Sequence, residues 1–113
     1  MPYTVNGKNA MLGALGVTHV SAHTADPGET GASEVTGGTY ARKSITFNAA
    51  AAGNLDSSNI PVLDIPAGVT VTHIGYFSAL TAGVFLASSD IVDETYSNAG
   101  TLTITDADLD LNL

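Results

Sequence analysis

The chain has 113 residues, the size of one domain that can build its own hydrophobic core. Three basic residues against eleven acidic ones give a formal net charge of −8. This balance argues against a nucleic-acid binder and against a peripheral protein of anionic membranes, because both depend on Lys and Arg. The chain has no Cys, which excludes disulfides, thiolate metal ligands and cysteine nucleophiles.

The low share of charged residues indicates how the surface is used. Only 12% of the residues are charged, whereas 44% are hydrophobic. Such a surface suits packing against further copies of the same chain or against a scaffold, because few charges have to be desolvated. We therefore expect the protein to self-associate, and the alternative is a weakly charged secreted or viral domain that stays monomeric.

Residues 1–16 are predicted to form an N-terminal arm or a short helix. Asn6-Gly7 can cap a helix that carries Met11, Leu12 and Leu15 on one side, and glycines limit it to two or three turns. The alternative is an irregular arm that the same three apolar side chains dock onto the domain.

Residues 17–113 are predicted to form a single all-β domain. Alternating β-branched and polar residues, separated by turn residues, predict strands at 17–24, 40–47, 60–65, 69–78, 84–88, 91–96, 101–105 and 109–113. The segments 25–39 and 48–59 are expected to be loops. Strand 69–78 is expected to form a hairpin with 84–88, and 91–96 another with 101–105. Seven or eight short strands indicate an antiparallel β-sandwich or barrel.

The ionisable residues do not suggest a catalytic, metal or cofactor site. His19 and His23 would lie about 13 Å apart on one strand, too far apart to share an ion, and His73 lies on another strand. We expect structural histidines. The alternating Asp106, Asp108 and Asp110 favour a solvated strand face over a calcium loop, with a weak surface cation site as the alternative.

Nothing in the sequence supplies the machinery of an enzyme. It contains no G-x-S-x-G nucleophile elbow and no phosphate-binding loop. Asp93 and Glu94 are adjacent on a predicted strand, so they point to opposite faces and cannot act on one substrate. We therefore predict that the protein is not an enzyme.

The segment from Ala25 to Lys43 is the most informative. Asp26-Pro27-Gly28 predicts a turn, in which the Asp carboxylate accepts backbone N–H bonds. Arg42 and Lys43 carry two of the three positive charges, so Asp26, Glu29 and Glu34 are their expected partners. These pairs are either surface ion pairs worth under about 1 kcal/mol or, at a subunit boundary, contacts that set the register.

The same segment carries a family resemblance. The run from His23 to Lys43 resembles small virion proteins of tailed bacteriophages, whose members read approximately HTADPG.TG..EV.GG.YAR. Similar residues follow in matching order along nearly the whole chain, at Pro66-Ala67-Gly68, Thr72-His73-Ile74-Gly75, Phe85-Leu86 and Asp106-Ala107-Asp108-Leu109. The resemblance implies a structural β-rich module, assembled in symmetric copies on the virion and without catalytic residues.

Two locations on the virion fit this resemblance. The chain has no coiled coil or collagen-like repeat to form a fibre shaft, which favours a decoration protein on the outer surface of the phage head, homotrimeric and bound to the major capsid protein. The alternative is a minor tail or tail-fibre component that attaches to the host surface, with a surface glycan as its partner. The residues expected at interfaces are Met11, Leu12, Leu15, His23, Asp26, Glu34, Tyr40, Arg42 and Lys43.

Overall fold

The protein is all-β with one short helix, as predicted. A computed structural model describes residues 3–105 and 107–111. Its elements, in chain order, are α1 (Val5–Gly13), β1 (His19–His23), β2 (Lys43–Ser44), β3 (Asn54–Asp56), β4 (Val62–Ile65), β5 (Val69–Phe77), β6 (Phe85–Tyr96), β7 (Gly100–Thr103) and β8 (Asp108–Asp110).

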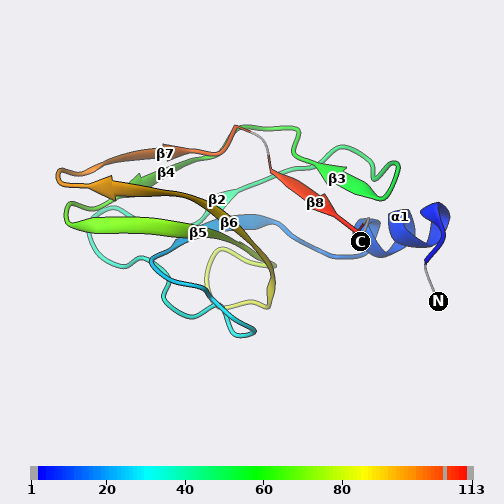
Figure 1. Cartoon of the computed structure of the whole chain (residues 1–113), viewed down its shortest axis with the longest axis horizontal. Helices are drawn as coiled ribbons and strands as arrows, with labels where there is room; N and C mark the ends of the chain where they lie inside the picture. The colour runs from blue at the N-terminus through cyan, green and yellow to red at the C-terminus, as the bar shows by residue number, and fades with distance from the viewer. Residues whose placement is uncertain (1–2, 106, 112–113) are drawn as a thin grey trace.

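All strand pairs are antiparallel, and the strands form three separate sheets. The main sheet has the order β2-β1-β5-β6, while β3 pairs with β8 and β4 pairs with β7. Figure 1 shows the β4–β7 ribbon stacked on the β5–β6 part of the main sheet, and the β3–β8 ribbon toward the end that carries α1. In the described residues no ladder joins the three sheets, so the arrangement is an open sandwich rather than a closed barrel.

The main core lies between these layers. Val20 and Ala22 from β1 and Ile74 and Tyr76 from β5 are buried on the inner face of the main sheet. Leu63 from β4 belongs to the same cluster and is fully buried. Beta-branched and aromatic residues suit these positions because they pack well on a pleated surface.

The helix begins earlier than predicted. Thr4, rather than Asn6-Gly7, is the N-cap, and its Oγ1 accepts a hydrogen bond from the Gly7 N–H at 3.1 Å. Of the three apolar residues expected on one side, Leu12 is buried, Met11 is exposed and Leu15 lies beyond the end of the helix. No helix among the described residues is long and apolar enough to span a membrane.

Two strand predictions were wrong in extent. Of the predicted strand at 40–47, only Lys43–Ser44 form a strand, β2. Tyr40 and Arg42 turn toward the loop before it. The predicted strands at 84–88 and 91–96 are one strand, β6, since Ser89 and Asp90 pair with Ile74 and His73 across the ladder.

Two pairings were also missed. The loop predicted at 48–59 contains β3, which pairs with β8 far along the chain. The expected hairpin of 91–96 with 101–105 does not form, because β7 pairs with β4 instead and places Leu102 opposite Leu63. Strands so far apart in sequence carry no local pattern that predicts their pairing.

The longest predicted strand, 69–78, is confirmed as β5, but its faces are not those of a regular strand. Val71 and Ile74 both belong to the main core although they are three residues apart. The pairing register with β6 shifts between Val71 and His73, and this irregularity lies between the two core residues.

The C-terminal strand has the predicted division of faces where it is described. In β8, Leu109 is buried while Asp108 and Asp110 on either side of it are exposed. Asp106 and Leu113, which belonged to the same prediction, lie outside the described residues.

Substitutions at the neighbouring residues Val62 and Leu63 on β4 test where the core lies. Leu63 is fully buried, so Leu63→Ala should lower the free energy of unfolding by about 2–5 kcal/mol through lost burial and a cavity. Val62→Ala removes a side chain that is 42% exposed and should cost much less. Equilibrium denaturation of both variants measures the difference, and equal costs would contradict this placement of the core.

Candidate functional site: the loop clasp

The outer face of the main sheet is covered by the long loop 24–42. Ser21 and His23 of β1 point to this face, opposite to Val20 and Ala22, and both are fully buried. Figure 1 shows loop 24–42 beside the β5–β6 connection, residues 78–84, and the two loops project together from the sheet. We call the side chains that hold them the loop clasp: His23, Glu34, Tyr40, Arg42 and Phe77.

Arg42 is the centre of the clasp. Its Nε and Nη2 donate to the two oxygens of Glu34, each at 2.9 Å, which is a bidentate ion pair. Its Nη1 donates to the carbonyl oxygens of Ala79 at 3.1 Å and Ala82 at 2.8 Å. The guanidinium group lies 3.4 Å from the centre of the Phe77 ring, a cation–π contact. One side chain therefore connects both loops to the sheet.

Glu34 receives a third hydrogen bond, from the Tyr40 hydroxyl at 2.8 Å, and that hydroxyl accepts from the Ala22 N–H at 3.0 Å. Burial alone would raise the pKa of Glu34, but the hydrogen bonds from Arg42 and Tyr40 and the charge of Arg42 hold it below its usual value. Burial, together with the carboxylate of Glu34, raises the pKa of Tyr40. Glu34 is therefore ionised and Tyr40 neutral near pH 7.

His23 lies beneath the loop as a neutral side chain. Burial lowers its pKa, which favours the uncharged ring. Its Nδ1 lies 2.8 Å from the carbonyl oxygen of Ala32, which can only accept, so Nδ1 carries the proton. Its Nε2 then accepts from the Ser21 hydroxyl at 2.7 Å. The ring also stacks on Phe77 and meets Phe85 edge-on.

Two glycines allow the loop and the sheet to come this close. A Cβ on Gly75 would collide with the His23 ring and Ser21 Oγ. A Cβ on Gly31 would collide with the Phe77 and Phe85 rings, and this residue also has a φ of +77°, in the region that favours glycine. The sequence around Gly31 and Gly75 does not predict that either position must be glycine, because each requirement comes from a contact with another segment of the chain.

The structure brings four of the nine predicted interface residues together, namely His23, Glu34, Tyr40 and Arg42. Asp26 instead accepts from the Gly28 N–H at 2.9 Å within its own turn, as predicted. Lys43 lies in β2, and Met11, Leu12 and Leu15 lie at the α1 end of the molecule. Their role as an interface stays a prediction.

Of the three acidic residues expected as partners of Arg42, the structure selects Glu34. Phe77, Phe85 and the two carbonyl oxygens of the β5–β6 connection were not predicted. Thr18 contacts His19, Thr72 contacts His73, and His73 pairs across the ladder with His23, while the structural role expected for the three histidines stays a prediction. No group of three metal-ligating side chains gathers within residues 3–105 and 107–111.

The structure is thus an all-β module in which one internal ion pair fixes two loops against the sheet. The family model described as "Podophage GP4 fiber I protein gp80" matches residues 7–112. The chain belongs to this family, and it is a structural protein of a phage virion. No curated protein matches it significantly.

Replacing Arg42 by Lys tests the clasp. Lysine keeps the positive charge but cannot bind Glu34 in a bidentate manner while donating to both carbonyl oxygens. Arg42→Lys should lower the free energy of unfolding by roughly 2 kcal/mol and speed hydrogen exchange in both loops. The matched control is Lys43→Arg, which should leave exchange in the loops unchanged. Unchanged exchange in Arg42→Lys would show that the loops do not depend on the clasp.

The neutral state of His23 predicts a pH dependence. Its pKa is lowered in the folded state, so its contribution to stability is present above about pH 6.5 and is lost as the pH falls further. The unfolded chain then takes up a proton that the folded chain does not, with a slope of at most about 1.4 kcal/mol per pH unit. His23→Gln should remove this slope below about pH 6.5, as measured by denaturation, whereas His19→Gln should keep it. An unchanged slope in His23→Gln would contradict the neutral ring.

Proposed function

We propose that this protein is a structural subunit of a fibre attached to the phage tail, in which copies of the chain associate as a homotrimer. The observation that carries the proposal is the match to a fibre protein family over residues 7–112. This favours the tail-fibre hypothesis over decoration of the head by a protein bound to the major capsid protein.

The shape and surface of the protein support an assembled role. The molecule is elongated, with extents of 45 × 26 × 25 Å. It exposes large apolar side chains on several elements, among them Val5, Ile60, Leu80, Val84 and Val92. Together with the low share of charged residues, such positions suit contacts between copies.

The loop clasp supports a role in contact with the host. Loops held by a rigid scaffold are where proteins place binding residues. Here Arg42 holds loop 24–42 and the β5–β6 connection together, and a shallow groove of about 500 Å³ lies between them, with Tyr40 and Leu80 in its lining. We propose that this projecting end of the molecule faces the host surface, with a glycan as the ligand class.

The number of copies in each virion distinguishes the two locations. Quantitative mass spectrometry of purified virions, with the major capsid protein as reference, should find a few to a few tens of copies if the protein forms a tail fibre. Hundreds of copies would indicate decoration of the head, because only the shell offers that many equivalent sites. Immunogold labelling gives an independent test, since it should mark the tail and not the head.

A further inference from the structure

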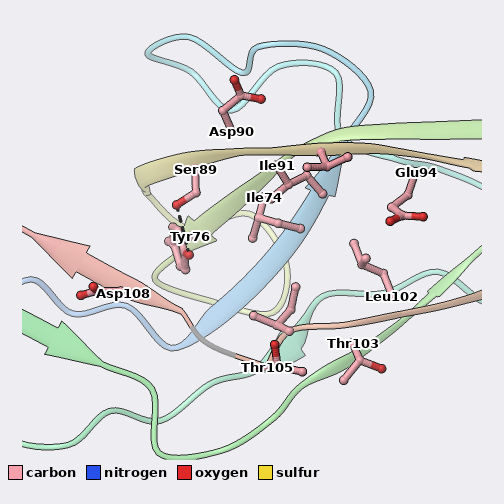
Figure 2. Close-up of a pocket in the computed structure, with 12 residues that line it drawn as sticks. Ile74, Tyr76, Ser89, Asp90, Ile91, Glu94, Leu102, Thr103, Thr105 and Asp108 are labelled. Carbon is pink, nitrogen blue, oxygen red and sulfur yellow. Dashed lines mark hydrogen bonds between the residues drawn. The ribbon is translucent and has the colours of Figure 1, made fainter.

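One side of the sandwich is open. β6 pairs only with β5 and β7 only with β4 among the described strands, so each leaves one edge without a strand partner. Figure 2 shows the space between these layers, with Ile74, Ser89 and Ile91 on one side and Leu102 and Thr103 on the other. This groove has a volume of about 390 Å³.

A second groove continues the first toward α1. It has a volume of about 490 Å³ and shares Ser89 and Asp108 with the groove in Figure 2. Its lining includes Met11, Leu86 and Leu111. We call the two together the β6 groove; they follow β6 from Leu86 to Glu94, a length of about 26 Å for an extended strand.

The β6 groove combines an apolar floor with an acidic border. Carboxylates line it at Glu94, Asp108 and Asp110, and β6 also exposes Asp93. In Figure 2, Glu94 points into the space between the layers, whereas Asp90 projects from the other side of β6. Among the residues that the structure describes, no Lys or Arg lines either part of the groove.

A second copy of the chain does not complement the negative charge of this border. Pairing β6 with β6 of another copy would bring the acidic residues of both strands together in a protein of net charge −8. Of its three cations, Arg42 is already bound to Glu34 on the opposite face of the main sheet. Charges on an edge strand are a known protection against pairing of like strands. A basic segment, by contrast, would be attracted.

We propose that the β6 groove binds an extended segment of another virion protein, with basic and apolar side chains, which adds as a strand to β6. The backbone of β6 would supply hydrogen bonds, the apolar floor would hold alternate side chains, and the carboxylates would select Lys or Arg. The proposal rests on the protein being a virion component and not on its place at the tail. The proposed trimer would then use other surfaces.

Photo-crosslinking within the assembled virion tests the occupant. A photoreactive phenylalanine analogue replaces Val92, which is 85% exposed and lines the groove, so the substitution should not disturb the fold. The same analogue at Ile60, which is 60% exposed and lies outside the groove, is the matched control. We expect position 92, and not position 60, to crosslink to a basic and apolar segment of another virion protein, identified by peptide sequencing.

Every other result at position 92 overturns the proposal. A crosslink to a second copy of the chain would make the β6 groove an interface between copies. A crosslink to a segment without basic residues would remove the charge argument, and the lack of any crosslink in virions that contain the protein would show that the groove stays empty. Because copy number and labelling are measured separately, a failure here leaves the proposed location untouched.

A charge reversal tests the role of the acidic border. Glu94→Lys should reduce the crosslink at position 92 by about tenfold or more, because it sets like charges against each other. Glu29→Lys makes the same change of charge at an exposed position in the loop and should leave the yield unchanged. Equal yields in both variants would contradict electrostatic selection of the segment.

Discussion

The bidentate ion pair of Arg42 with Glu34 is the contact on which the outer half of the molecule depends. Both side chains are largely removed from water, which makes such a pair costly unless its remaining hydrogen-bonding groups are satisfied. Here they are, because Arg42 also donates to two backbone carbonyls and Glu34 also accepts from Tyr40. The pair therefore fixes the relative position of two loops and a sheet, a matter of geometry more than of net stability.

The clasp also explains why β1 is buried on both faces. Val20 and Ala22 pack into the main core, while Ser21 and His23 lie beneath loop 24–42. Polar side chains are tolerated there because the His23 ring is neutral and both its nitrogens have partners. The close approach requires Gly75 on the neighbouring strand, so the identity of one residue in β5 is set by a ring on β1.

The sequence predicted the local features of this fold better than its pairings. The all-β class, the turn at Asp26-Pro27-Gly28 and the long strand β5 follow from alternation and turn chemistry, and the structure confirms them. The β3–β8 pair was missed because the two strands are distant in the chain, and β6 was divided in two although Ser89 and Asp90 continue its ladder with β5. Similarly, opposite charges indicated Glu34 as a partner for Arg42, but nothing local indicated that Phe77 would lie beneath the guanidinium group.

The two sides of the molecule differ in how their charge is distributed. The clasp neutralises Arg42 internally, and the long edge strand β6 carries only acidic charges beside an apolar groove. An edge of this kind opposes pairing with its own copies, yet it leaves backbone groups and apolar surface available to a partner of opposite charge. The proposed assembly requires both properties, because copies must stay soluble before they assemble and must then meet a defined neighbour. The loop clasp ties two loops to one side of the sandwich, and the open side holds the groove that we propose for assembly.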